Sequence, residues 1–483
     1  MPTRPNILIF LMDTQPVRNM TCYGFAQNTT PNVQKIADEG LVYDQHYGTG
    51  AWTVPTHASL FTGKYQSGHG AGAQYEYLSR SFPTLAEALN ENGYATIGFN
   101  NNSWVSQDET NIARGFSQWV MIPRPMGRNV QAGPEDEYIV ETNVDSGASS
   151  TIDAIMQWFD HERDASKPFF MFVNCIEPHL RVWAPEPFRS RFLLSGVSQA
   201  QARRVNQDEY AERLGTVPDR ADGHMTQADW DILKSLYDGE TAYLDSRMGI
   251  VFDFLRARGI LDETLLIITA DHGDLLERRG LMGHHLALFD DLIHTPLIVR
   301  KPGLIPQSAR FSGFVQICDW FPTFLDLLDI RSDKLAGEIH GVSMAPTWRG
   351  EPTRDFALAE YQKGVQVVER ALRIAPLDWD YRPWLRRIKT IRAGQFKYHW
   401  YSDGADLLFD VSADPGERHN LIAERPEIAT ELRKKIESLL LSVKRHDFGD
   451  KLRNHGFRNV RWDNMARLSA LGAYREIEDG GDS

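Results

Sequence analysis

Three apolar segments of the sequence end in side chains that could bind a metal ion. Residues 5–12, 168–175 and 264–270 are short, nearly continuous apolar runs, typical of parallel strands covered on both faces. They are followed by Asp13, by Glu177-Pro178-His179 and by Asp271-His272-Gly273. Because sites in open α/β sheets form beyond the carboxyl ends of the strands, we expect these side chains to meet at one edge. Taken singly, each could instead be a helix cap or an ordinary loop histidine.

A hydroxyl that could act as a nucleophile lies in the segment 51–63. Pro55 near a first helical turn and Gly63 at the end predict a short helix that begins near Thr53. One interpretation is that Thr53 or Thr56 simply caps this helix. The functional interpretation is that Thr53, activated by a metal ion and by the positive end of the helix, attacks a tetrahedral anionic centre.

The elements that must position these residues alternate between strand and helix patterns. A fourth apolar run covers residues 94–100. A stripe at helical spacing before the last strand comprises Leu244, Met248, Val251 and Leu255. The alternation predicts an α/β fold with a doubly wound, mostly parallel sheet. Asn101 and Asn102 follow the run at 94–100, and this position makes them candidates for substrate contact, although weaker ones than the residues above.

From about residue 356 the apolar segments become shorter and alternate with polar residues. Residues 1–355 are expected to form the catalytic α/β domain, and residues 356–443 a small C-terminal α+β domain with a final helix near 426–443. The polar tail at 444–483 contains at most one short helix. It is a candidate for packing on a neighbouring subunit, which would make the protein a homo-oligomer.

The composition limits the classes of partner. The 483 residues carry a net charge of −13, which argues against a wide nucleic-acid surface and requires local positive charge for an anionic substrate. No segment approaches the roughly 18 apolar residues of a membrane span, and the apolar start is too short for an export signal. We therefore expect no membrane partner and a cytoplasmic location. Cys22, Cys175 and Cys318 lack metal or disulfide spacing and are expected to be small core residues.

Several motifs occur in a fixed order from about residue 5 to residue 440. They are residues 6–13, Thr30-Pro31-Asn32, 53–63, 269–273, 283–285, 294–298, 408–410, 414–417 and 420–421. In order and type they resemble the motifs of the sulfatase family, which belongs to the alkaline phosphatase superfamily. The resemblance implies an alkaline-phosphatase-like sheet, a smaller C-terminal domain and a metal-dependent hydrolase of a phosphoric or sulfuric ester.

The resemblance also implies roles for individual residues. On the family's pattern, Asp13, Thr53, Asp271 and His272 fall on the metal-binding positions, and Thr53 also falls on the nucleophile. Three further residues fall where the family keeps positive or proton-donating groups around the transferred group. They are His57, His179 and His284.

The sequence departs from the family at the nucleophile. Typical sulfatases carry Cys or Ser in a Cys-x-Pro-x-Arg type motif and convert it to formylglycine, whereas this chain reads Thr53-Val54-Pro55-Thr56-His57. The hydrated formylglycine has two hydroxyls, one to take the sulfuryl group and one to expel it, and threonine has one. Superfamily branches with a threonine nucleophile are mainly phosphoryl-transfer enzymes. We therefore expect hydrolysis of phosphodiesters or phosphonate monoesters, small anionic esters, through a covalent Thr53 intermediate.

Two other functions remain open from the sequence. One is a sulfatase that uses unmodified Thr53, and the other is an inactive member that binds an anionic ligand. The metal set of two carboxylates, one imidazole and one hydroxyl favours manganese or zinc over calcium. We expect one divalent ion, because a second would need another Asp/His cluster.

Overall fold

The computed structural model describes residues 4–72, 75–123, 143–212, 225–277, 281–331, 338–362 and 381–444, together with positions 335, 364, 365, 367 and 368. The tail at 445–483, for which the sequence predicts at most a short helix and a subunit contact, lies outside the described residues. Within the described part, no helix is both long enough and apolar enough to cross a membrane.

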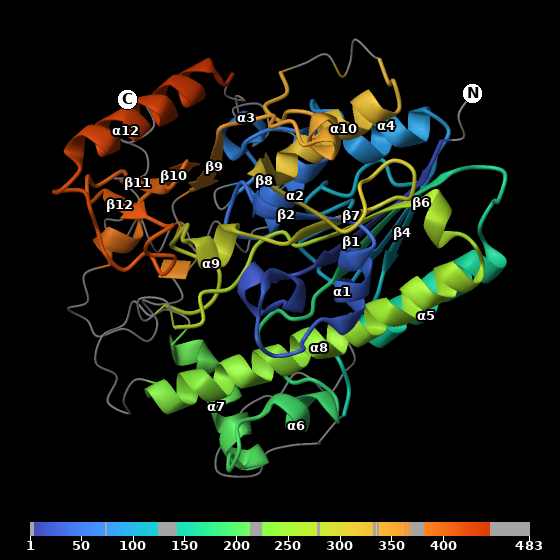
Figure 1. Cartoon of the computed structure of the whole chain (residues 1–483), viewed down its shortest axis with the longest axis horizontal. Coiled ribbons are helices and arrows are strands. Elements are labelled where there is room, and N and C mark those ends of the chain that lie inside the picture. Colours follow the sequence, from blue (N-terminus) through green and yellow to red (C-terminus); the bar gives the residue numbers. More distant parts are fainter. Residues whose placement is uncertain are drawn as a thin grey trace.

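An eight-stranded sheet forms the centre of the molecule (Figure 1). Its strands, in spatial order, are β4 (Gln118–Met121), β3 (Ala95–Asn100), β5 (Phe169–Cys175), β1 (Asn6–Met12), β6 (Thr264–Thr269), β7 (Leu297–Arg300), β2 (Leu41–Tyr47) and β8 (Ala309–Gln316). The four strands predicted from apolar runs, β3, β5, β1 and β6, are neighbours and pair in parallel. β7 is antiparallel to both β6 and β2. The predicted mostly parallel, doubly wound sheet is therefore confirmed.

Helices cover both faces of this sheet (Figure 1). One face packs against α1 (Pro31–Asp38), α5 (Ala148–His161) and α8 (Gln227–Ala257), and it receives the even-numbered side chains of β1. The other face packs against α2 (Thr53–Thr62), α4 (Leu85–Glu91) and α10 (Trp320–Leu327), and it receives Ile7, Ile9 and Leu11. All seven residues of β1 are buried. Burial on both faces explains why the strand sequences are continuous rather than alternating.

The remaining α-helices of the described residues before the second sheet are α3 (Gln66–His69), α6 (Phe188–Phe192), α7 (Gln199–Glu212) and α9 (Asp290–Ile293). Cys22, Cys175 and Cys318 are buried and unbonded to one another, as expected for small core residues.

A second, antiparallel sheet follows in the sequence. Its strands are β12 (Leu407–Asp410), β11 (Phe396–Tyr401), β10 (Ile388–Ala393) and β9 (Phe356–Tyr361). α12 (Pro426–Ser442) packs its apolar side chains against this sheet. The observed elements are those expected for an α+β unit after residue 356.

Candidate active site

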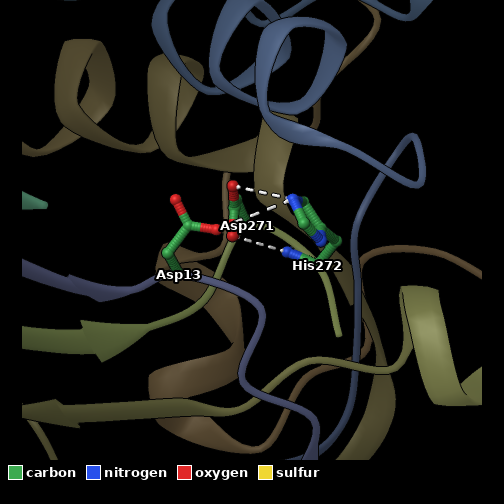
Figure 2. Close-up of side chains that lie close together, drawn as sticks. All are labelled: Asp13, Asp271 and His272. Atoms are coloured by element: carbon green, nitrogen blue, oxygen red, sulfur yellow. Dashed lines mark hydrogen bonds and ion pairs between the residues drawn. The ribbon is translucent and has the colours of Figure 1, made fainter. Parts of the chain in front are cut away.

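Two carboxylates and one imidazole converge at the carboxyl ends of β1 and β6. Asp13 follows β1 directly, and Asp271 and His272 follow β6 after one residue. One ligand atom of each residue lies within 4.8 Å of the others, and all three side chains are fully buried (Figure 2). His272 Nε2 is 3.2 Å from Asp271 Oδ2 and 3.9 Å from Asp13 Oδ1. The structure thus brings together three of the four protein ligands expected from the sequence; the fourth, Thr53, is described below.

The orientation of His272 suits a metal ion. Its Nδ1–H donates to the carbonyl oxygen of Gly273 at 3.0 Å, so the lone pair of the neutral ring lies on Nε2 and faces the carboxylates. Burial lowers the pKa of His272, but Asp271 and Asp13 outweigh it and raise the pKa to about 9. Asp271 Oδ2 and His272 Nε2 are buried without a hydrogen-bond partner among the described residues. Two buried carboxylates beside one imidazole form an anionic site that a divalent cation would neutralise.

The loop after β1 holds Asp271 from the other side. Thr14 has a positive φ of 62°, and its backbone N–H donates to Asp271 Oδ1 at 3.3 Å. The hydroxyl of Tyr237, in α8, donates to the carbonyl oxygen of Thr14. The backbone of a β-branched residue is strained in this region, and surrounding contacts must maintain it. Tyr237 is therefore linked to Asp271 through Thr14.

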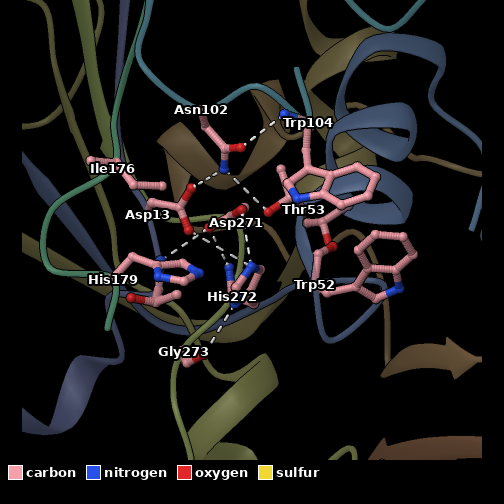
Figure 3. Close-up of polar contacts among 12 residues, drawn as sticks. Asp13, Trp52, Thr53, Asn102, Trp104, Ile176, His179, Asp271, His272 and Gly273 are labelled. Atoms are coloured by element: carbon pink, nitrogen blue, oxygen red, sulfur yellow. Dashed lines mark hydrogen bonds and ion pairs between the residues drawn. The ribbon is translucent and has the colours of Figure 1, made fainter. Parts of the chain in front are cut away.

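Thr53 is the first residue of α2, and Trp52 precedes it in extended conformation. Trp52, at the N-cap position, makes no capping bond with its side chain, and the hydroxyl of Thr56 donates back to the carbonyl oxygen of Trp52 at 3.0 Å. The capping interpretation of Thr53 is therefore wrong. Asn102 Nδ2 lies 3.4 Å from Thr53 Oγ1 and 2.6 Å from Asp13 Oδ2, which links the hydroxyl to the carboxylate cluster (Figure 3).

The two asparagines that follow β3 have different surroundings. Asn101 accepts from the Ile176 backbone N–H at 2.7 Å and donates to the carbonyl oxygen of Ser146 at 3.3 Å. Its amide thus connects two loops, whereas Asn102 lies in the site. Glu177, which follows β5, accepts from the backbone N–H groups of Ser146 and Ala148 and so binds the start of α5.

His179 and His284 lie beside the cluster of Asp13, Asp271 and His272. The His284 ring stacks on His272 with a centroid distance of 4.6 Å, and the His179 ring meets His284 edge-on at 5.0 Å. Both are half-buried, so they border the fully buried cluster. This position suits groups that could donate a proton to a departing oxygen.

His57 has a different setting, inside α2. Its Nδ1–H donates to the carbonyl oxygen of Thr53 at 2.9 Å, and its ring packs edge-on against Phe172. Burial lowers the pKa of His57, although the Asp271 carboxylate, 3.7 Å from Nδ1, opposes that shift. The side chain is therefore a neutral ring that fixes the first turn of the helix carrying Thr53.

Four residues of this region were not identified in the sequence: Thr14, Trp52, Trp104 and Tyr237. Trp52 and Trp104 lie beside Thr53 (Figure 3), and each is within two residues of a candidate. Their proximity along the chain could have indicated them. Tyr237 lies on α8, far from every motif in the sequence, and no local signal indicates it.

Two family models match the sequence of this chain. A sequence model of the sulfatase family, described as "Sulfatase", matches residues 5–330. A second, "N-sulphoglucosamine sulphohydrolase, C-terminal", matches residues 283–445.

Similar proteins include several sulfatases. N-acetylglucosamine-6-O-sulfatase of Bacteroides thetaiotaomicron is 24% identical over 93% of this chain and 88% of its own length. Arylsulfatase K of Bos taurus is 24% identical over 91% of this chain and 82% of its own length.

Among solved structures, the phosphonate monoester hydrolase of Agrobacterium radiobacter superposes with a TM-score of 0.72 at 23% identity, over 91% of this chain and 96% of that chain. The phosphonate monoester hydrolase of Silicibacter pomeroyi superposes with a TM-score of 0.68 at 20% identity, over 92% and 97% of the two chains. At these identities the likeness establishes the shared fold.

Proposed function

The chain belongs to the sulfatase family, and we propose that it hydrolyses phosphodiesters or phosphonate monoesters with Thr53 as a covalent nucleophile. Family membership makes it a hydrolase of sulfuric or phosphoric esters. The assignment of Thr53 as the nucleophile rests on its place in the structure. Thr53 is the first residue of α2, and its hydroxyl is linked through Asn102 to the Asp13 carboxylate. A threonine in this position offers one hydroxyl and no route to formylglycine.

A divalent metal ion fits the buried cluster. Asp13, Asp271 and His272 would hold it with Thr53 as a further ligand, and the imidazole favours manganese or zinc. Such an ion supplies Lewis-acid chemistry, lowering the pKa of a nearby hydroxyl and neutralising charge on the transferred group.

In the first half-reaction, which forms the covalent intermediate, each residue of the site has a separate role. Thr53 Oγ1 loses its proton to solvent and forms a bond to phosphorus while the bond from phosphorus to the leaving oxygen breaks. The positive end of α2 favours the developing negative charge near Thr53. The Asn102 amide keeps the hydroxyl in place. His179 or His284 gives its proton to the leaving oxygen.

The second half-reaction restores the enzyme. Water attacks phosphorus, the bond between phosphorus and Thr53 Oγ1 breaks, and Thr53 regains a proton. The histidine that lost its proton takes one from the attacking water. A phosphoryl ester accepts such a second in-line attack when its charge is neutralised by cationic groups. Sulfuryl transfer offers less negative charge to neutralise, and the two-hydroxyl route of formylglycine is absent.

The alternative is a sulfatase that uses unmodified Thr53. It is favoured by the curated relatives, which carry sulfatase names and align over most of this chain. The two proposals differ in the transferred atom, so one comparison separates them.

The test compares matched aryl esters. Protein supplied with manganese or zinc is given 4-nitrophenyl phenylphosphonate, a 4-nitrophenyl phosphodiester and 4-nitrophenyl sulfate, which share one leaving group. We expect a higher kcat/KM for the phosphorus esters. The intact mass should show an unmodified Thr53 at rest. A clear preference for the sulfate with Thr53 unmodified would replace the phosphoryl assignment by the sulfatase alternative.

Variants of α2 test the nucleophile. Thr53→Val keeps the shape but removes the hydroxyl, so turnover should fall by at least about 10³-fold with a stability cost near 1 kcal/mol. Thr62→Val is the matched control, because Thr62 is a buried threonine of the same helix whose hydroxyl donates to the Ala58 carbonyl oxygen. The control should lose similar stability and keep its activity. Full turnover in Thr53→Val would exclude Thr53 as the attacking group.

A further inference from the structure

Five aromatic rings follow one another past the nucleophile. The centroid distances along this series are 6.1 Å for Trp104 to Trp52, 6.2 Å for Trp52 to His285, 4.5 Å for His285 to His284 and 5.0 Å for His284 to His179. The rings come from four separate segments, namely the loops after β3 and β5, the start of α2 and the loop at 283–285. We call these five residues the aromatic arc.

The aromatic arc lies between the buried cluster and solvent. Thr53 is 3% exposed and Asp13, Asp271 and His272 are fully buried, whereas Trp104, His179, His284 and His285 are half-buried. Four of the five rings are therefore more exposed than the cluster, and His284 stacks directly on His272.

The two ends of the aromatic arc differ in chemistry. Trp52 and Trp104 present uncharged indole faces beside Thr53, and the Trp104 backbone N–H donates to Asn102 Oδ1 at 3.0 Å. His179 and His284 present imidazoles beside His272. Figure 3 shows both tryptophans on the side of Thr53 away from Asp13, with His179 on the opposite side. One end suits an apolar group, and the other suits an oxygen that takes up a proton.

In-line displacement assigns the two organic groups of the substrate to different places. The nucleophile and the leaving oxygen lie at opposite apices of the transition state, so a group that stays on phosphorus lies around the equator, off the line that joins Thr53 to the leaving oxygen. We infer that Trp52 and Trp104 form a subsite for an apolar, preferably aromatic, group that stays bonded to phosphorus. The inference rests on the proposed function, since a sulfate monoester has no such retained group.

The subsite makes a prediction about substrate preference. In aryl esters of phenylphosphonate and methylphosphonate, the bond from phosphorus to the aryl oxygen breaks and the bond from phosphorus to carbon stays intact. The phenyl group would gain ring contacts and burial against the indoles that a methyl group is too small to make. Trp104 is the better residue to change, because Trp52 is also part of the buried core.

The experiment measures kcat/KM for 4-nitrophenyl phenylphosphonate and 4-nitrophenyl methylphosphonate with manganese-supplied protein. The ratio of the two values, phenyl over methyl, should fall on the order of tenfold in Trp104→Ala. It should stay within about threefold of wild type in Trp104→Phe, which keeps an aromatic face. Trp400→Ala is the control, since Trp400 is a half-buried tryptophan of β11 in the other sheet, and it should leave the ratio unchanged. An unchanged ratio in Trp104→Ala overturns the subsite while the phosphoryl assignment stands.

A binding measurement keeps the subsite testable if wild-type protein cleaves the sulfate alone and the proposed function fails. Calorimetry then compares phenylphosphonate with methylphosphonate on the manganese-supplied protein. Tighter binding of phenylphosphonate that is lost in Trp104→Ala supports the subsite. Equal binding of the two ligands by the wild-type protein overturns it.

Discussion

At the scale of single residues, Asn102 joins three parts of the site. Its Nδ2 reaches both Asp13 and Thr53, and its Oδ1 accepts from the Trp104 backbone. An amide can do this because it carries two donor hydrogens and an acceptor. The position after β3 brought Asn102 forward as a candidate in the sequence, but it gave the same weight to Asn101. Which of two adjacent asparagines faces the site depends on the loop backbone, and composition does not encode that.

A substitution of Asp271 can show whether the cluster of Asp13, Asp271 and His272 holds a metal ion. Wild-type protein should be stabilised by added manganese or zinc, by about 2.7 kcal/mol at a metal concentration 100 times Kd. Asp271→Asn removes one negative charge, so it should lose bound metal, the metal-dependent rise in Tm and nearly all turnover. Elemental analysis and thermal unfolding measure these effects.

Asp245→Asn is the matched control for this substitution. Asp245 is also a buried aspartate, but it accepts from the backbone N–H groups of Asn32 and Val33 at the start of α1. Its variant should lower Tm with and without metal and keep the metal-dependent rise. Full metal content in Asp271→Asn would contradict the assigned site.

If His179 or His284 protonates the leaving oxygen, its removal should slow esters with poor leaving groups more than esters with good ones. His179→Ala and His284→Ala should slow the cleavage of a phenyl ester more than that of a 4-nitrophenyl ester, by up to about 10²-fold, because a 4-nitrophenolate needs little protonation. Steady-state rates with both esters measure the difference. His419→Ala, which changes an exposed histidine, should slow neither ester. Equal losses on the two esters would assign both histidines to binding rather than to proton transfer.

At the scale of elements, sequence reasoning succeeded where one physical rule dominates. Buried parallel strands must be apolar on both faces, so β1, β3, β5 and β6 were predictable within a residue or two of their observed bounds. β2 contains Asp44, Gln45 and His46 and was not recognised, because tertiary contacts override its mixed composition. Of the long helix α8, only the stripe from Leu244 to Leu255 was predicted. Its first half carries Tyr237, whose hydroxyl donates to the carbonyl oxygen of Thr14 beside the candidate site.

α8 should therefore influence metal binding through Tyr237. Tyr237→Phe leaves the carbonyl oxygen of Thr14 without its donor, at a cost of about 1–2 kcal/mol in the free energy of unfolding. Because Thr14 also donates to Asp271, metal affinity should fall about tenfold. Tyr243→Phe on the same helix is the control, since its hydroxyl contacts Asp145 and Ser149 instead. A metal affinity unchanged by Tyr237→Phe would show that Thr14 does not transmit the effect.

At the scale of the whole molecule, two sheets are joined by buried charges. Lys397, on β11, pairs with Asp290 at 2.6 Å and with Glu417 at 3.0 Å. Asp290 begins α9, which precedes β7 of the large sheet. The Lys397–Glu417 pair is fully buried, and such a pair stabilises one arrangement of its partners because an unpaired charge in the interior is costly. The resemblance of residues 408–421 to the family's second domain indicated this unit in the sequence, but periodicity alone does not predict the ion pairs.

Two buried groups, His69 and Asp238, change the free energy of unfolding in opposite directions as the pH falls. His69 is held as a neutral ring, since Nδ1 accepts from the Ala71 N–H at 3.0 Å and Nε2 bonds to Ser59 at 3.1 Å. Burial lowers the pKa of His69 to about 3. Below about pH 6.5 the unfolded chain takes up a proton there and the folded chain does not, so stability falls. Burial raises the pKa of Asp238 to about 7, and this carboxyl group acts in the opposite direction.

A single variant isolates the contribution of His69. His69→Gln should cost stability at pH 7.5, and the cost should shrink by about 1.4 kcal/mol for each pH unit between 6.5 and 4.5. Urea unfolding of both proteins across this range measures the difference. A cost that does not change with pH would mean that His69 takes up a proton as readily in the folded protein as in the unfolded chain.

The place of β1 in the sheet has a consequence for synthesis of the chain. Both neighbours of β1 are strands that follow it by more than 150 residues, and all seven of its side chains are apolar or buried in the finished sheet. At 5–20 residues per second, β6 leaves the ribosome on the order of tens of seconds after β1. During that interval the segment that carries Asp13 has no partner on the β6 side. The nascent chain therefore exposes an apolar segment during this interval, and the candidate metal site can form only once residue 272 has emerged.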